Sequence, residues 1–289
     1  MMDLRYEAPG TVAAAVALLA GAEGEARVLA GGTDLLVQLR AELIDPGLVV
    51  DLKRIPELCE IAAEDGGFRI GAAVTGAELG EHAGLRETWP GVVEAVELIG
   101  TTQIQGRATM VGNLCNASPA ADSVPALVVA GATVTIAGPD GRRQAPVAEI
   151  ATGPGATSLM PGEIVVSLFL PTPPPRTGSA YLRFIPRTEM DIAVVGAGVA
   201  LTLDADGVCT AARVALAAVA ERVMLVPEAA DALVGTGCDA AALARLEAAA
   251  RGACRPIDDK RGTKEFRIKV AGVLARRAAL KALERAGRN

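Results

Sequence analysis

The chain has 289 residues, enough to bury a substantial core as one large domain or as two to three smaller ones. It carries 28 Lys and Arg residues against 34 Asp and Glu residues, and no basic stretch is interleaved with aromatic residues, which argues against a nucleic-acid-binding function. The longest uncharged stretch, 123–139, is interrupted by proline and glycine and is not expected to cross a membrane.

Little in the chain suggests a metal site or a secretory signal. The N-terminus, MMDLRYEAPG, has early acidic residues and no apolar run, so we expect a cytoplasmic protein. The cysteines form no C-x-x-C pair, and each is predicted to be a small buried residue: Cys59, Cys115, Cys209, Cys238 and Cys254. The single histidine, His82, and the single tryptophan, Trp89, are expected to be structural.

The first predicted elements alternate between helix and strand. Apolar residues recur at helical spacing over 12–20, with Thr11 as the N-cap. The segment 26–30, ARVLA, predicts a buried strand that ends at a glycine pair, and Thr33 or Asp34 is expected to cap a helix over 35–43.

Further strands are predicted over 48–52 and 68–74, and Thr75 is suited to cap the mainly helical segment 76–99. This alternation predicts a mixed lobe of α/β or α+β type. The segment 100–122 is polar, rich in small residues and typical of neither a helix nor a hairpin, so we expect a long functional loop.

The domain boundary is expected after a strand over 164–171, where the prolines of TPPPRTGS favour an extended connector. A hairpin around a Pro-Asp-Gly turn is predicted before it, over 131–147. The expected first domain therefore covers 1–176, with subdomains of about 1–57 and 58–176, and the second covers 177–289. The second domain should begin with strands and end with helices from about Pro227.

One segment of the second domain, DIAVVGAGVAL at 191–201, looks like the start of a dinucleotide-binding turn. However, Leu201 stands at the third glycine position of that motif, and the LTLDADGVCT that follows has no helical period. A hairpin strand whose glycines allow close packing is the favoured interpretation.

Two glycine-bearing loops carry the chemistry of the first domain: AGGTDLL at 30–36 and TMVGNLCNASPAAD at 109–122. Glycines let backbone N–H groups approach a pyrophosphate because no Cβ intervenes. The first glycine pair also precedes a predicted helix N-terminus, which favours an anion.

The second loop adds polar side chains. The Thr109 hydroxyl is suited to a phosphate, Gly112 to close approach, and the Asn113 amide to orienting the loop or a cofactor. Asp122 is suited to ribose hydroxyls or, equally, to a turn or helix cap.

In this order and separation, the two loops resemble those of the FAD-binding medium subunits of the xanthine dehydrogenase and carbon monoxide dehydrogenase family. The resemblance continues through TVAAAVALLA, VVDLKRIPEL, GAAVTGAEL, PGEIVVSLFLP and YLRFIPRTEMDIAVVGAGVAL. It implies an α+β fold: a two-lobed FAD-binding domain of the vanillyl-alcohol oxidase (PCMH) type, then a C-terminal domain with a small antiparallel sheet and helices.

The resemblance also implies which residues bind FAD: the two loops around the pyrophosphate, Val165 near the isoalloxazine, and Gly100, Asp122 and Arg183 beside the cofactor. A loop glycine, a buried strand residue and a surface cation are the alternatives for Gly100, Val165 and Arg183. The implied cofactor-binding residues are Leu29, Ala30, Gly31, Gly32, Thr33, Asp34, Leu35, Leu36, Gly100, Thr109, Met110, Val111, Gly112, Asn113, Asp122, Val165 and Arg183. Many relatives have Gly-Gly where this chain has Val111-Gly112, so one phosphate contact is expected to differ.

The implied role is electron transfer. A molybdopterin large subunit would oxidise the substrate, a small subunit with 2Fe-2S clusters would relay electrons, and FAD in this chain would pass them to an acceptor such as NAD. We therefore expect no catalytic side chain and no metal ligand in this chain. The expected assembly is a dimer of heterotrimers. A self-contained flavin-dependent reductase and a flavin-free scaffold remain alternatives. The first loop reads GGTD where many carbon monoxide dehydrogenases have GGHS, which disfavours carbon monoxide as the substrate.

Overall fold

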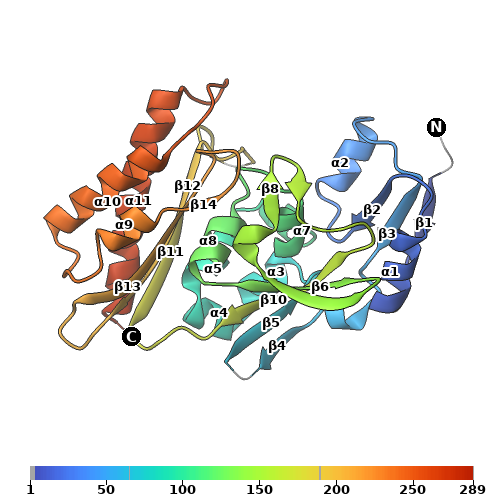
Figure 1. Cartoon of the computed structure of the whole chain (residues 1–289), viewed down its shortest axis with the longest axis horizontal. Coiled ribbons are helices and arrows are strands. Elements are labelled where there is room, and N and C mark those ends of the chain that lie inside the picture. Colours follow the sequence, from blue (N-terminus) through green and yellow to red (C-terminus); the bar gives the residue numbers. More distant parts are fainter. Residues whose placement is uncertain (1–3, 65, 189, 289) are drawn as a thin grey trace.

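The structure is a computed structural model that describes residues 4–64, 66–188 and 190–288. Three main sheets follow one another along the molecule, with the N-terminal sheet at one end and the C-terminal sheet, with its long helices, at the other (Figure 1). Within the described residues, no helix is both long and apolar enough to span a membrane. The expected α+β class is confirmed, because parallel and antiparallel sheets occupy separate parts of the chain.

The first sheet is parallel, in the order β1-β3-β2, and its strands are β1 (Arg5–Glu7), β2 (Ala26–Leu29) and β3 (Leu48–Asp51). Helix α1 (Val12–Ala20) begins as predicted, since the Thr11 hydroxyl accepts a hydrogen bond from the Ala14 N–H at 3.2 Å. The central strand β3 is fully buried. The strand predicted over 26–30 is confirmed as β2, but its predicted burial is wrong, because β2 lies at the sheet edge and leaves Val28 38% exposed.

Helix α2 (Leu35–Arg40) follows the glycine pair, with Asp34 at its cap position. The side chain of Asp34 makes no capping hydrogen bond, so side-chain capping is not what starts this helix. The reason is conformational: Asp34 has φ −97° and ψ −48°, whereas a capping side chain needs an extended backbone.

The second sheet is antiparallel, in the order β4-β5-β10-β6-β7. Its strands are β4 (Ile61–Glu64), β5 (Gly67–Gly71), β6 (Thr133–Gly138), β7 (Gly141–Pro146) and β10 (Ile164–Pro171). The predicted hairpin is the pair β6 and β7. Helices α3 (Gly76–Glu81), α4 (Ala83–Thr88), α5 (Pro90–Val96) and α8 (Ser123–Val129) follow in the same lobe, with the small pair β8 (Ala151–Gly153) and β9 (Ala156–Thr157).

The expectation of a long loop over 100–122 is wrong, because two short helices form there: α6 (Thr102–Gln105) and α7 (Met110–Cys115). Threonine hydroxyls cap both, Thr101 for α6 and Thr109 for α7. Met110 and Leu114 of α7 are buried in the core, and this packing stabilises a helix too short to persist alone.

The third sheet is antiparallel, in the order β11-β12-β13-β14, formed by β11 (Thr177–Phe184), β12 (Val195–Leu203), β13 (Cys209–Ala217) and β14 (Met224–Leu225). Helix α11 (Lys264–Ala286) packs on β11 and β12 and against α10 (Ala240–Ala253), while α9 (Pro227–Asp231) packs against α10 and β13. Helices α5 and α8 of the second lobe also contact this sheet.

The interpretation of DIAVVGAGVAL as a hairpin strand is confirmed. Its glycines belong to β12, which pairs with β11 and β13 and leads into no helix. A Cβ on Gly198 would lie 2.9 Å from the carbonyl oxygen of Pro125, so the glycine allows α8 to approach the sheet.

Candidate functional site

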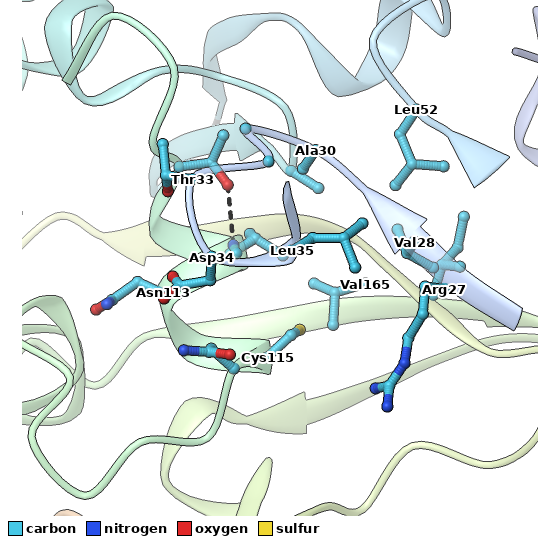
Figure 2. A pocket seen from close by; sticks show the side chains of 18 of the residues that line it. Arg27, Val28, Ala30, Thr33, Asp34, Leu35, Leu52, Asn113, Cys115 and Val165 are labelled. Atoms are coloured by element: carbon cyan, nitrogen blue, oxygen red, sulfur yellow. Dashed lines mark hydrogen bonds between the residues drawn. The ribbon is translucent and has the colours of Figure 1, made fainter. Parts of the chain in front are cut away.

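A cleft of about 360 Å³ opens between the first sheet and the second lobe. The loop between β2 and α2 forms one wall, and α7 with β10 forms the other (Figure 2). Segments from distant parts of the sequence, 26–38, 108–116 and 157–165, therefore share one site. The two glycine loops singled out in the sequence both line it.

The first loop packs at Gly31 against the backbone of Arg107 and Ala108, directly before the second loop. A Cβ at this position would lie 2.1 Å from the carbonyl oxygen of Arg107, far inside van der Waals contact. The neighbouring Gly32 has φ +79°, a left-handed conformation that favours glycine. Glycine is therefore required at position 31 for close backbone approach and at position 32 for its backbone conformation.

The first loop offers a row of free backbone donors. Within the described part of the chain, the N–H groups of residues 31–34 donate to no protein acceptor, while the Gly32 carbonyl already accepts from the Leu36 N–H at 3.0 Å. Unpaired N–H groups next to a cleft lower the free energy of an anion held there. The arrangement therefore suits a phosphate group without any basic side chain.

A short network supports the base of this loop. Lys53 donates to the Ala30 carbonyl at 3.1 Å and to the Asp51 carboxylate at 2.8 Å. Tyr6 donates to the same carboxylate at 2.6 Å. Burial alone would raise the pKa of Asp51, but the hydrogen bonds from Lys53 and Tyr6 hold it below its ordinary value, so the carboxylate stays ionised.

The second loop is held by its own hydrogen bonds. The Thr109 hydroxyl accepts from the Gly112 N–H at 2.9 Å, and the Asn113 side-chain oxygen accepts from the Ser123 hydroxyl at 2.7 Å. Val111, where the family resemblance implies a second glycine, is 6% exposed and packs in the core while bordering the cleft. Its side chain is thus accommodated mainly by the core.

Labelled side chains lie on two sides of the cleft (Figure 2). Thr33, Asp34 and Asn113 lie toward one side, and Val28 and Leu52 lie toward the other, together with Arg27. Burial raises the pKa of the Asp34 carboxyl above its ordinary value. A partly desolvated carboxyl at the cleft, next to free backbone donors, is suited to a ligand that presents hydroxyls as well as an anion.

The structure brings most of the predicted residues to the cleft, but not all. Those that line it are Ala30, Gly31, Gly32, Thr33, Asp34, Leu35, Thr109, Val111, Gly112, Asn113 and Val165. Those outside its lining are Leu29, Leu36, Gly100, Met110, Asp122 and Arg183. Leu29 and Leu36 flank Gly32 instead, and Met110 is buried in the core.

Asp122 and Arg183 form a buried cluster behind the cleft. Arg183 donates to the Asp122 carboxylate and to the Leu98 carbonyl, both at 2.8 Å, and the Tyr181 hydroxyl donates to the other Asp122 oxygen at 2.8 Å. Burial raises the pKa of Asp122, although Arg183 and Tyr181 oppose that rise. Leu98 precedes Ile99, which does line the cleft, so the cluster holds a segment of its wall.

Several lining residues were not predicted from the sequence. The polar ones are Arg27, Gln38, Asn116, Thr157 and Glu163. Asn116 could have been found, since it lies within the second loop motif at 109–122. The others come from a strand edge, a helix face and the region before β10, and only the packing of the lobes brings them to the cleft.

Comparison with protein families identifies both parts of the chain. Residues 2–173 match the model of the FAD binding domain in molybdopterin dehydrogenase. Residues 180–282 match the model of the CO dehydrogenase flavoprotein C-terminal domain. These two matches together extend over nearly the whole sequence.

Relatives and solved structures agree with the family models. The chain is 35% identical to the carbon monoxide dehydrogenase medium chain of Afipia carboxidovorans, covering 97% of each chain. It is 32% identical to the xanthine dehydrogenase FAD-binding subunit of Escherichia coli O157:H7, covering 98% of this chain and 97% of that subunit. Its fold matches a chain of the reconstituted CO dehydrogenase from Oligotropha carboxidovorans with a TM-score of 0.94 at 35% identity, covering 98% of each chain.

A chain of quinoline 2-oxidoreductase from Pseudomonas putida 86 is also similar, with a TM-score of 0.91 at 30% identity and 98% coverage of each chain. The similarity thus extends over full-length chains in both sequence and fold. With the glycine loops meeting at one cleft, these matches show that the chain belongs to the family of FAD-binding medium subunits of molybdenum hydroxylases.

Proposed function

We propose that this chain binds FAD in the cleft and transfers electrons from a 2Fe-2S subunit to a terminal acceptor such as NAD, within a molybdenum hydroxylase complex. The observation that carries the proposal is the row of free N–H groups at residues 31–34, which faces the second loop across the cleft. A diphosphate carries negative charge that such donors stabilise without a basic side chain.

The residues present fit this cofactor. The backbone of Gly31 to Asp34 would hold the diphosphate, with Thr109 and Gly112 completing the site from the opposite wall. Val165, which is 3% exposed and lies on β10, would pack against the flavin ring. The Asp34 carboxyl, which lines the cleft and makes no side-chain capping bond, is available for a cofactor hydroxyl.

Asp122 and Arg183 would support the site from behind. Each is paired with the other, and Arg183 also bonds the Leu98 carbonyl, two residues before Gly100. Because the segment from Leu98 to Gly100 forms part of the wall or adjoins it, the ion pair would fix its position against the cofactor. Gly100 has φ +68°, so the turn there depends on glycine.

Bound flavin would supply the exchange between carriers that move one electron at a time and an acceptor that takes two. The protein's part would be to bind the cofactor, orient its ring and limit the access of water. We therefore assign no side chain of this chain to substrate chemistry.

The proposed partners are an iron–sulfur small subunit and a molybdopterin large subunit, assembled as a dimer of heterotrimers. One relative is named as subunit alpha of the 6-hydroxypseudooxynicotine dehydrogenase complex. Other relatives are named for carbon monoxide, xanthine, nicotinate and caffeine, although their sequences resemble this chain to similar degrees. This variety supports a substrate choice made in another subunit.

Release of the cofactor tests the binding proposal. The chain is purified together with its partner subunits and denatured. The supernatant is then examined by absorption spectroscopy and mass spectrometry. We expect FAD in equimolar amount to the chain. Flavin-free protein that also fails to take up added FAD would contradict the proposal and favour a scaffold.

Co-purification tests the complex. We expect an affinity tag on this chain to retain one iron–sulfur chain and one large molybdenum-containing chain. Rapid mixing with reduced partner should then bleach the flavin absorption, and addition of NAD or another acceptor should restore it. Sustained substrate turnover by the isolated chain would instead favour a self-contained reductase.

A further inference from the structure

Two cysteines in the C-terminal domain lie against each other. Cys209 begins β13, and Cys238 lies in the turn directly before α10. The Cys209 N–H donates to the Thr236 carbonyl at 2.8 Å, and the Gly235 N–H donates to the Cys209 carbonyl at 2.8 Å. These bonds hold the turn at 235–238 beside the start of the strand.

The two side chains lie in the same core cluster, and each thiol shifts the pKa of the other. The Cys209 thiol also contacts the Ala211 carbonyl at 3.3 Å, and the Cys238 N–H donates to the Thr236 hydroxyl at 3.0 Å. The proximity of Cys209 lowers the pKa of Cys238, whereas the proximity of Cys238 raises the pKa of Cys209. Cys238 is therefore the thiol that more readily becomes a thiolate.

The pair is buried but close to the surface. Cys209 is 0% exposed and Cys238 is 4% exposed. The turn above them contains Gly235 and Gly237, both exposed, and a Cβ at either glycine would meet no atom within 4 Å. The glycines make this turn the segment whose movement would expose Cys238 to a small oxidant.

We propose that Cys209 and Cys238 form an oxidisable dithiol that closes to an intramolecular disulfide in the presence of a peroxide. The Cys238 thiolate attacks hydrogen peroxide, breaks the O–O bond and becomes a sulfenic acid, and the departing hydroxide takes up a proton to leave as water. The Cys209 sulfur then attacks the sulfenic sulfur, and its proton leaves with the hydroxyl as a second water. Two thiols and one peroxide give one disulfide and two waters.

The disulfide would join the start of β13 to the N-terminus of α10. Helix α10 lies on one face of the third sheet, and the lobe that carries the cleft lies on the other (Figure 1). Neither cysteine lines the cleft. Closing a loop that contains β14 and α9 restricts the unfolded chain, so oxidation should raise the thermal stability of the domain. Flavin content should not change.

The test is peptide mapping of the full-length chain in its complex. The protein is incubated with hydrogen peroxide, its remaining thiols are alkylated under denaturing conditions, and the digest is analysed by mass spectrometry without reduction. We expect a peptide pair joined through Cys209 and Cys238 that dithiothreitol separates, and a rise of a few degrees in Tm that dithiothreitol reverses.

Variants provide the matched comparison. Cys254 is also buried in this core, but its thiol donates to the Ala250 carbonyl at 3.1 Å and has no thiol partner among the described residues. Cys254→Ala should keep the cross-link and the Tm rise, and Cys238→Ala should lose both. Recovery of Cys209 and Cys238 as separately alkylated or separately over-oxidised residues in the wild-type digest would overturn the proposal, even if the variants fold poorly.

Discussion

At the scale of single residues, Gly31 determines whether the two loops of the cleft can touch. A Cβ there would lie 2.1 Å from the Arg107 carbonyl oxygen and 2.8 Å from the carbon of the same carbonyl. Backbone atoms cannot move aside as the end of a flexible side chain can. Even the methyl group of alanine would therefore force the walls of the cleft apart.

We expect Gly31→Ala to lower the free energy of unfolding by about 3 kcal/mol and to remove most of the bound FAD. Gly47→Ala is the control, because a Cβ at Gly47 meets no atom within 4 Å and the residue has no positive φ. Urea denaturation and the flavin-to-protein absorbance ratio measure the two effects. Normal flavin content in Gly31→Ala would show that the loop contact is dispensable.

At the scale of elements, Thr109 is expected both to stabilise α7 and to contribute to FAD binding. A threonine cap on a helix far from the cleft distinguishes the two effects. Thr109 caps α7 at the cleft, and Thr263 caps α11 in the other domain, where its hydroxyl accepts from the Phe266 N–H at 3.2 Å. Both Thr109→Ala and Thr263→Ala should cost about 1 kcal/mol of stability. Only Thr109→Ala should weaken FAD binding, as measured by fluorescence titration, and Thr109→Ser should restore it.

An ionic contact joins α5 of the second lobe to α11 of the C-terminal domain. The Glu94 carboxylate accepts hydrogen bonds from Arg285 at 2.6 Å and also from Lys281 and the Tyr181 N–H. Burial alone would raise the pKa of Glu94, but these partners hold it below its ordinary value of 4.5. A carboxylate with a depressed pKa stabilises the fold above its ordinary pKa, and that contribution is lost as the pH falls through the folded value.

We therefore expect Glu94→Gln to lower the free energy of unfolding by about 2 kcal/mol at pH 7, with the difference from wild type disappearing in acid below pH 4.5. Glu284→Gln is the control, since Glu284 pairs with Arg288 on an exposed face and should change stability very little. Chemical denaturation across this pH range measures both. A Glu94→Gln deficit that persists unchanged in acid would contradict the assignment.

At the scale of the whole molecule, there are two hydrophobic cores. The first takes most of its residues from 12–170 but also Tyr181, Ala200 and Ala215 of the third sheet, the second lies within 180–286, and only the first borders the cleft. A ligand that binds the native state stabilises the segments whose opening would release it. Hydrogen exchange should therefore show that FAD protects residues 30–38 and 108–116. Helix α10, which packs in the second core, should exchange at the same rate with and without flavin.

The sequence by itself determined the local elements and the type of site. The spacing of apolar residues, the helix caps and the Pro-Asp-Gly turn located α1, the β6–β7 hairpin and the helical C-terminus, because these signals are local. The glycine loops indicated an anion site for the same reason. The loop expectation for 100–122 failed, since α6 and α7 are short and depend on Thr caps and on core burial.

Only the tertiary structure decided which residues share the cleft. It brought Arg27 and Gln38 to the lining, and it placed Asp122 and Arg183 behind the wall, bound to each other. It also showed why Gly31 must be glycine, since Arg107 is distant in sequence. Such contacts depend on how three sheets pack against one another, and packing between distant segments leaves no periodic signal in a single sequence.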